Sequence, residues 1–332
     1  MLSGPEFTNL IFDDHAYFEE LTFSLFRYQY AYNKLYRDYL EALGIKKEDV
    51  RSVAEIPYLP ISFFKTHEVK SGDFVPELIF ESSGTTGMTP SRHLVKEASV
   101  YERSFRKGFE RFYGPVTDYV VIGLLPSYLE RSHSSLVYMV NDMVKRSGKP
   151  ESGFYLNEHE KLRNCLVSLQ EARKKVLLIG VTFGLLDFAE SYSLQLDRTI
   201  VMETGGMKGR REEWTRSEVH SFLKDRLGVQ TVHSEYGMSE LLSQAYSKGE
   251  GIFRCPPWMR VVLRDETDPL ETLESPKQGV SEGLINVIDL ANTYSCAFIA
   301  TDDIGRLHAD GSFEVLGRMD HSDLRGCSLL VS

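Results

Sequence analysis

A short stretch near residue 85 combines six hydroxyl side chains with two glycines, between two apolar segments; its centre reads Ser82-Ser83-Gly84-Thr85-Thr86-Gly87. Glycines let backbone N–H groups turn inward and hydroxyls supply further donors, so such a loop can hold a polyphosphate. The stretch therefore predicts a phosphate-binding loop. A Walker A loop is disfavoured because no lysine follows Gly87, and the three glycines of a dinucleotide fingerprint are absent. A plain surface turn rich in serine and threonine remains the alternative.

The composition is that of an ordinary globular protein, with 332 residues, 42% hydrophobic and 26% charged. A net charge of −10 argues against nucleic acid or an anionic membrane surface as the main partner. Neither a secretory leader nor a run of 18 apolar residues is found, which predicts a cytoplasmic protein without a membrane span. The four cysteines are scattered and indicate neither a zinc site nor a disulfide framework.

The apolar pattern predicts elements that alternate along the first 250 residues. Three- and four-residue steps predict one aromatic-rich helix over 14–43, opened by Asp13-Asp14, and later helices over 98–112, 134–146, 162–169 and 215–227. Short apolar runs predict strands at 119–122, 176–180 and 199–202. This order is typical of an α/β fold with a mainly parallel sheet covered by helices.

The pattern changes after about residue 251. Strand-like segments at 258–263, 283–288 and 297–300 follow one another without a long helix between them, and 306–316 reads as a hairpin with Asp310-Gly311 at its turn. We expect one large domain over 1–318, made of a helical leader (1–75), an α/β body (76–250) and a β-rich subdomain (251–318), with a truncated hinge-like tail over 319–332.

Three further strings follow the hydroxyl-rich loop in chain order. They are Glu203-Thr204-Gly205-Gly206-Met207, then Ser234-Glu235-Tyr236-Gly237-Met238-Ser239-Glu240, then 300–306 running into Gly317-Arg318-Met319-Asp320. In this order the four strings resemble the motifs of the adenylate-forming enzymes, the superfamily of acyl-CoA synthetases, firefly-type luciferases and peptide-synthetase adenylation domains. The resemblance covers roughly residues 80–326 and implies the large N-terminal domain of these enzymes, with ATP and Mg²⁺ as cofactors.

The resemblance also implies which residues meet the phosphates and the metal. The loop residues Ser82, Ser83, Gly84, Thr85, Thr86 and Gly87 would hold the leaving pyrophosphate, with Thr85 and Thr86 acting in catalysis. Glu240 matches the expected Mg²⁺ ligand, and magnesium is commonly bound by one or two carboxylates together with substrate phosphates. Ser239 stands where the family usually has a threonine that reaches a phosphate. Taken alone, Glu240 could simply cap a helix.

The rest of the implied nucleotide site lies in the later strings. Gly205, Gly206 and Met207 would lie against the adenine, and Tyr236, followed by Gly237, offers a ring for stacking. Asp303 matches the ribose-binding aspartate, and Arg318 is a candidate ribose or phosphate contact. Read singly, Tyr236 could be a core residue and Asp303 part of a turn.

The end of the sequence departs from most of the superfamily. These enzymes usually carry a hinge and a small mobile domain with a catalytic lysine after Gly-Arg-x-Asp, whereas this sequence stops at Ser332. The lid domain is therefore expected to be missing. The chain resembles the acyl-protein synthetases of bacterial luminescence operons, which activate a fatty acid as acyl-AMP and move it to a cysteine near their C-terminus. The strings at 56–60 and 325–329, and an expected turn at 182–187, fit that branch.

The expected function is activation of a carboxylic acid, in particular a fatty acid, to acyl-AMP with release of pyrophosphate, followed by transfer to a thiol. Cys327 is the expected acceptor, because Arg325 can lower its pKa and Gly326 lets the backbone bend. A buried structural cysteine is the alternative. A carrier protein or coenzyme A could also accept the acyl group, and a nucleotide- or acyl-binding module without catalysis is a further alternative.

Overall fold

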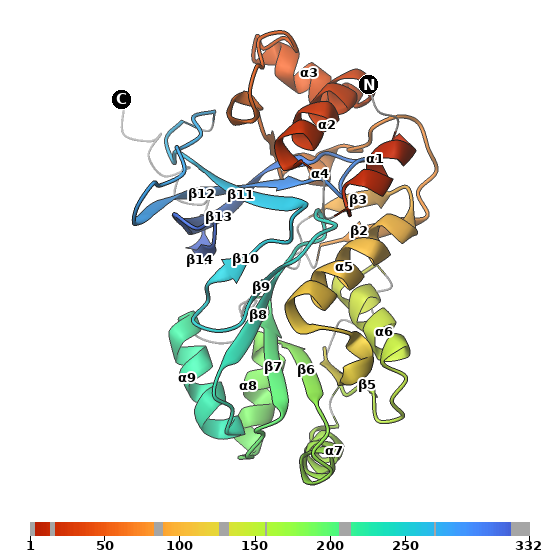
Figure 1. The fold of residues 1–332 in the computed structure, drawn as a ribbon, viewed down its shortest axis with the longest axis vertical. Coiled ribbons are helices and arrows are strands. Elements are labelled where there is room, and N and C mark those ends of the chain that lie inside the picture. The colour runs from red at the N-terminus through yellow and green to blue at the C-terminus, as the bar shows by residue number, and fades with distance from the viewer. Residues whose placement is uncertain are drawn as a thin grey trace, which may run out of the picture.

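A computed structural model describes residues 4–13, 17–82, 89–125, 133–156, 158–205, 214–268 and 270–319. Its main feature is a twelve-stranded sheet with the order β11-β12-β13-β14-β10-β9-β8-β7-β6-β4-β5, and β1 pairs with β13 (Figure 1). The strands are β1 Leu59–Pro60, β2 Leu78–Glu81, β3 Arg92–Val95, β4 Val120–Leu124, β5 Gly153–Phe154, β6 Val176–Val181, β7 Thr199–Thr204, β8 Val232–Tyr236, β9 Ala245–Ser247, β10 Phe253–Arg254, β11 Met259–Arg264, β12 Val280–Asp289, β13 Phe298–His308 and β14 Phe313–Arg318.

Helices cover the sheet and form the N-terminal part. They are α1 Gly4–Leu10, α2 Phe18–Tyr32, α3 Lys34–Ala42, α4 Phe63–Thr66, α5 Ala98–Tyr113, α6 Ser135–Ser147, α7 His159–Glu171, α8 Thr182–Ser191 and α9 Arg216–Leu227. Within the described ranges, none of them combines the length and the apolar character needed to cross a membrane.

Strands β4 to β8 form the predicted parallel part of the sheet. All six residues of β6 are buried because both faces are covered. Leu177 and Ile179 pack in one core cluster with residues of α5 and α6, whereas Val176 and Leu178 pack in a second cluster with residues of α7, α8 and α9. Figure 1 shows α8 and α9 on one side of these strands and α5 and α6 on the other. The α/β prediction is confirmed.

Two of the predicted helices begin and end at the residues that the sequence indicates. The Ser134 hydroxyl accepts a hydrogen bond from the Val137 amide at the start of α6, and Gly148 ends that helix with a φ of +63°. At α9, Thr215 forms a capping box with Glu218, and Gly228 ends the helix, also at a φ of +63°. These helix ends depend on residues that are close together in the sequence, so they can be predicted from it.

Two local predictions are wrong, and one strand was not predicted. The expected helix over 14–43 is two helices, because the Asn33 side chain accepts the Tyr36 amide and starts α3 anew; asparagine readily replaces backbone hydrogen bonds in this way. The expected turn at 182–187 is the first part of α8, whose residues 182–186 are all buried, so that no one-sided apolar pattern marks the helix. A strand, β3, also precedes α5 and pairs with β2.

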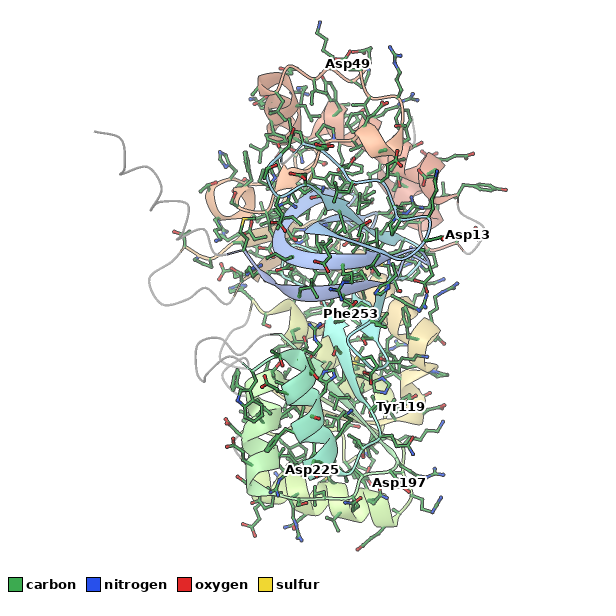
Figure 2. All side chains as sticks on the ribbon, turned by 90° about the vertical axis from the view of Figure 1, so that its left-hand side faces the viewer. Asp13, Asp49, Tyr119, Asp197, Asp225 and Phe253 are labelled. Atoms are coloured by element: carbon green, nitrogen blue, oxygen red, sulfur yellow. The ribbon has the colours of Figure 1, made fainter. Side chains whose placement is uncertain are left out.

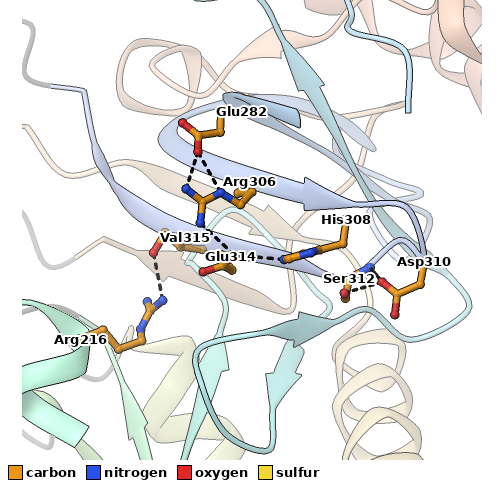
Figure 3. A network of polar contacts seen from close by, with 8 residues as sticks. All are labelled: Arg216, Glu282, Arg306, His308, Asp310, Ser312, Glu314 and Val315. Carbon is orange, nitrogen blue, oxygen red and sulfur yellow. Dashed lines mark hydrogen bonds and ion pairs between the residues drawn. The ribbon is translucent and has the colours of Figure 1, made fainter. Parts of the chain in front are cut away.

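The β-rich part is an antiparallel arrangement of β11, β12, β13 and β14. The predicted hairpin is confirmed: Gly311 has a φ of +79°, and the Asp310 carboxylate accepts the Ser312 amide at 3.0 Å. Arg306 on β13 pairs with Glu282 on β12 and with Glu314 on β14, so charge links the three strands on one face (Figure 3). The hairpin thereby holds the outer end of the sheet in one register.

Hydrogen bonds also join this antiparallel part to the parallel part. Phe253 on β10 pairs with Ser247 on β9 and with Phe313 on β14, and it lies midway along the molecule in Figure 2. Arg216 on α9 donates to the Val315 carbonyl at 2.9 Å, which adds a second link (Figure 3). The strands are therefore continuous across the expected boundary at residue 250, and the division into subdomains stays a prediction.

The N-terminal helices pack on the sheet through aromatic rings. Phe298 on β13 is fully buried, and its ring centroid lies 6.2 Å from that of Phe26 on α2 and 6.0 Å from that of Tyr36 on α3. Tyr58, before β1, contacts the same ring at 6.4 Å. Phe298 thus connects three segments of the leader to a central strand.

We predict that Phe298→Ala destabilises the fold by about 3 to 5 kcal/mol, because it removes a large buried ring and leaves a cavity. Denaturant unfolding measures this free energy. Tyr17→Ala, at an aromatic side chain that is 73% exposed just before α2, is the control and should change stability little. A Phe298→Ala loss no larger than that of the control would contradict the packing described here.

Candidate functional site

The predicted nucleotide-site residues come from the ends of neighbouring strands. β7 ends at Thr204 and is followed by Gly205, and the parallel neighbour β8 ends at Tyr236. Gly205 has a φ of +76°, which favours glycine, and its carbonyl accepts a hydrogen bond from the Thr182 hydroxyl. In open α/β sheets, ligands bind in the crevice outside the carboxyl ends of the strands. This edge is therefore the candidate active site.

Three predicted residues form one hydrogen-bonded cluster at this edge. The Tyr236 hydroxyl donates to Asp303 Oδ2 at 2.9 Å, and Arg318 Nε donates to Asp303 Oδ1 at 3.2 Å. Asp303 and Arg318 are directly paired across β13 and β14. Burial raises the pKa of the Asp303 carboxyl, while the Arg318 charge and the Tyr236 hydrogen bond act against that rise. The arrangement brings the aromatic ring of Tyr236 together with an acceptor that lies 67 residues later in the chain and with a cation 15 residues beyond that acceptor.

Tyr236 also has a structural role. Its ring is 8% exposed and makes edge contacts with Phe313 at 5.4 Å and with Phe253 at 6.0 Å. The alternative that Tyr236 is a core residue is thus correct for most of its ring. Stacking of the ring on adenine stays a prediction.

Glu240 is a mostly buried carboxylate in a turn between β8 and β9. It is 6% exposed, and the described chain continues from it into a strand, so the helix-cap alternative is wrong. Burial raises the pKa of Glu240; the nearby Ser91 hydroxyl and the positive charges of Arg318 and Lys65 act in the opposite direction. One carboxylate in a polar surrounding fits Mg²⁺, which is held by few protein ligands together with phosphate oxygens.

The neighbours of Glu240 have defined contacts. The Ser239 carbonyl accepts a hydrogen bond from His93 Nδ1 at 2.9 Å. A Cβ atom at Gly237 would lie 2.4 Å from Glu235 Oε1, so a side chain there requires the Glu235 carboxyl to move. The structure thus gives Ser239 and Gly237 contacts within the protein. Their contacts with a nucleotide stay predictions.

Part of the predicted site lies outside the described residues, namely Ser83, Gly84, Thr85, Thr86, Gly87, Gly206, Met207 and Cys327. Ser82 is described and exchanges two contacts with Ser91: its amide donates to the Ser91 carbonyl at 3.1 Å, and its hydroxyl accepts the Ser91 amide at 2.9 Å. The hairpin of β2 and β3 thereby holds the two ends of the hydroxyl-rich loop next to each other. The phosphate contacts of the loop stay predictions.

Sequence reasoning missed Glu235, a second buried carboxyl beside the site. Its carboxylate accepts a hydrogen bond from the Thr204 hydroxyl on β7. Burial raises the pKa of Glu235 to about 7, and the nearby Glu203 charge adds to the rise. An acidic residue directly before Tyr236 in a buried strand was the available signal.

Glu203 is the contrasting carboxylate on the opposite face of the sheet. Burial acts to raise its pKa, but the nearby His220 and Ser234 side chains and the Arg216 charge outweigh burial, so that the pKa of Glu203 is lowered. Glu203 also accepts the Thr182 hydroxyl at 3.0 Å. The strand ends thus hold one ionised carboxylate on the α9 side and one readily protonated carboxyl on the α5 side.

Comparison with known proteins agrees with this fold. A long-chain-fatty-acid-CoA ligase from Archaeoglobus fulgidus superposes with a TM-score of 0.50 at 12% identity, over 73% of this chain and 51% of that one. O-succinylbenzoate coenzyme A synthetase from Bacillus subtilis, in complex with ATP and magnesium ion, gives a TM-score of 0.50 at 15% identity, over 72% and 49%. This chain spans about half the length of these two structures. The fold is that of the N-terminal domain of adenylate-forming enzymes, as predicted.

Sequence comparison narrows the class to one family. The model of the family described as "Acyl-protein synthetase, LuxE" matches residues 13–332. The long-chain-fatty-acid–luciferin-component ligase of Aliivibrio fischeri is 24% identical over 351 residues, covering 95% of this chain and 87% of that protein. The chain belongs to the LuxE acyl-protein synthetase family. The branch predicted from the motifs is confirmed.

The raised pKa of Glu235 predicts a specific pH dependence of stability. Its pKa of about 7 in the folded protein exceeds the ordinary value of 4.5, so the unfolded chain loses this proton first as pH rises. Wild-type stability should fall relative to that of Glu235→Gln between about pH 4.5 and 7, by up to about 3 kcal/mol. Chemical denaturation at a series of pH values measures this difference.

Glu110→Gln, on the exposed face of α5, is the control and should follow the wild type throughout the series. Tyr101, Tyr246 and Glu203 are the titratable groups coupled to Glu235. The tyrosine pKa values are raised well above 10, which leaves them outside this pH range. Parallel pH curves for the wild type and Glu235→Gln would contradict the assignment.

Proposed function

We propose that this acyl-protein synthetase activates a long-chain or medium-chain fatty acid with ATP and transfers the acyl group to a thiol. The observation that carries the proposal is the cluster of Tyr236, Asp303 and Arg318 at the sheet edge that also holds Glu240. Family membership and the ligase name of the curated relative support acid activation. The solved neighbour with ATP and magnesium ion supports the choice of cofactors.

The described residues have the chemistry that ATP and Mg²⁺ require. Asp303 has two acceptor oxygens for ribose hydroxyls, and Arg318 is 62% exposed, so it can move toward a phosphate. Glu240 would hold the metal, with the Arg318 and Lys65 charges favouring its ionised form. When bound, Mg²⁺ would neutralise phosphate charge and orient the reacting groups.

The first step in this proposal forms a mixed anhydride. A carboxylate oxygen of the acid attacks the α-phosphorus of ATP, the new C(O)O–P bond forms, and the bond to pyrophosphate breaks. Both reactants are anions, so the chain contributes mainly positioning and charge neutralisation. The loop from Ser82 to Gly87 is proposed to hold the leaving pyrophosphate.

The second step transfers the acyl group. A thiolate attacks the acyl carbon, a thioester forms, and AMP leaves with the bonding electrons. We propose Cys327 as the acceptor, since Arg325 two positions earlier favours a thiolate. A carrier-protein thiol or coenzyme A is the second candidate; the names of the two solved structures, a CoA ligase and a coenzyme A synthetase, favour coenzyme A.

The first prediction for this function concerns Glu240. Purified protein with Mg-ATP and fatty acids of graded length should catalyse ATP–pyrophosphate exchange, and Glu240→Gln should reduce exchange by about a hundredfold or more. The substitution creates no cavity, so the thermal unfolding midpoint should change little. Glu314→Gln, which removes a carboxylate on β14 that pairs with Arg306 on β13, is the matched control and should retain exchange.

Failure of every acid in a broad panel, with no binding of ATP, would refute the enzyme proposal. Binding of ATP by calorimetry without acyl-AMP formation would instead favour a binding module that has lost catalysis.

The second prediction concerns Cys327. With radioactive fatty acid and ATP, the protein should acquire a hydroxylamine-sensitive label, and Cys327→Ser should abolish the label while pyrophosphate exchange continues. Cys165→Ser, on α7, is the control and should keep the label. A label that persists on Cys327→Ser would move the acceptor to another cysteine, and a thioester formed on added coenzyme A without labelled protein would select the external acceptor.

A further inference from the structure

The segment that carries Glu240 is buried but irregular. Residues 237–244 belong to no helix or strand, although the structure describes all of them. Leu241 and Ser243 are fully buried, and Glu240 is 6% exposed. Buried backbone N–H and C=O groups need hydrogen-bond partners, and among the described residues no strand backbone supplies them to this segment. Side chains from other parts of the chain therefore have to hold this segment.

Three buried side chains supply those partners at successive positions. His93 Nδ1 donates to the Ser239 carbonyl at 2.9 Å, and Asn292 Nδ2 donates to the Glu240 carbonyl at 2.8 Å. The Asp289 carboxylate accepts the amides of residues 242 and 243 at 2.8 and 2.9 Å. The backbone is thus held on both sides of the Glu240 Cα atom, and this fixes the direction in which the Glu240 side chain leaves the chain.

The Asp289 carboxylate accepts two hydrogen bonds in addition to these. Asp289 is completely buried, and its carboxylate also accepts the Ser243 hydroxyl at 2.6 Å and the Ala291 amide at 3.1 Å. All four donors are uncharged. A buried carboxylate is weak evidence for stability, since an apolar side chain of similar size often serves a fold equally well. Four directed hydrogen bonds do something that an apolar side chain cannot, which is to define the path of the backbone.

The turn that follows Asp289 at the end of β12 and carries Asn292 is itself anchored. Gln29 on α2 donates to the carbonyl groups of Asn292 and Thr293 at 2.8 and 3.2 Å and accepts the Ala297 amide at 3.0 Å. Gln29 is fully buried. The support for Glu240 therefore extends from the turn after β12 into the helical leader.

We propose that Asp289 and Asn292 are positioning residues that fix the Glu240 carboxylate for the divalent metal. This inference rests on the proposed function, because it takes Glu240 to be the metal ligand. Neither residue touches the substrates in this proposal; each acts through the backbone of residues 240–243.

The test measures metal binding without turnover. Mn²⁺ replaces Mg²⁺, ATP is present, acid is omitted, and electron paramagnetic resonance follows free Mn²⁺. Asn292→Ala and Asp289→Asn should each weaken Mn²⁺ binding by about tenfold. Amide hydrogen exchange should become faster at Leu242 and Ser243 in both variants, because a partner of this segment is lost.

Asn33 offers a matched control. It is an equally buried asparagine whose Nδ2 donates to the Ser295 carbonyl at 3.0 Å, three residues beyond Asn292, and it has no contact with residues 239–243 among its hydrogen bonds. Asn33→Ala removes the start of α3 and should lower stability, yet change Mn²⁺ affinity by less than about twofold. If Asp289→Asn does not fold, Ser243→Ala removes one of its four hydrogen bonds and should shift binding in the same direction by a smaller factor.

The outcomes distinguish the positioning role of Asp289 and Asn292 from the proposed function. Unchanged Mn²⁺ affinity in Asn292→Ala and in the Asp289 or Ser243 variant would overturn the inference, and so would an equal loss in Asn33→Ala. Absence of Mn²⁺ binding by the wild type in the presence of ATP would show instead that the proposed function is wrong, and would remove the metal that the inference requires.

Discussion

The two residues of β10 form the connection on which the candidate site depends. Phe253 pairs with β9 on one side and with β14 on the other, and its ring stacks on Phe313 at 5.4 Å. Tyr236 reaches the site from the parallel part of the sheet, whereas Asp303 reaches it from the antiparallel part. Their hydrogen bond at 2.9 Å can form because this short strand holds the two parts in one register. The site is thus assembled across the connection rather than within either part.

The two carboxyl groups near the ends of β7 and β8 lie on opposite faces of the sheet and differ in their pKa. Glu203 is held ionised beside Arg216 and His220, while Glu235, one residue further along the neighbouring strand, lies among tyrosines and a threonine. Side chains of adjacent strand residues point to opposite faces, so neighbouring positions can have opposite protonation behaviour. At the strand ends, the α9 face therefore carries an ionised carboxylate, while the α5 face carries a carboxyl group that is more easily protonated.

The parts of the structure that depend on local chemistry were predictable from sequence. The cap at Thr215 and the end at Gly228 involve residues within one helix, and the fully apolar strand at 176–180 reports burial on both faces. The break at Asn33 was not predictable, because the aromatic period continues through it and one side chain decides the outcome.

The candidate site likewise contains some residues that the sequence indicates and others that only the structure reveals. The motif strings located Tyr236, Asp303 and Glu240, because their residue types are tied to their chemistry. Asp289 left no such trace, since its partners are backbone amides 46 and 47 residues earlier in the chain, and any sequence has amides there. Glu235 required knowledge of strand register, which places it beside Thr204. Contacts between distant backbone and side chains are the part that only a folded structure supplies.

The close approach of Glu235 to Gly237 limits how this sequence can change. A methyl group at position 237 would lie 2.4 Å from a carboxylate oxygen of Glu235, well inside van der Waals contact. The contact is with the far end of the Glu235 side chain, so an alanine at position 237 requires the Glu235 carboxyl to move away from Thr204. A smaller residue at position 235 removes this contact, and the cost of a substitution at position 237 therefore depends on the residue at position 235.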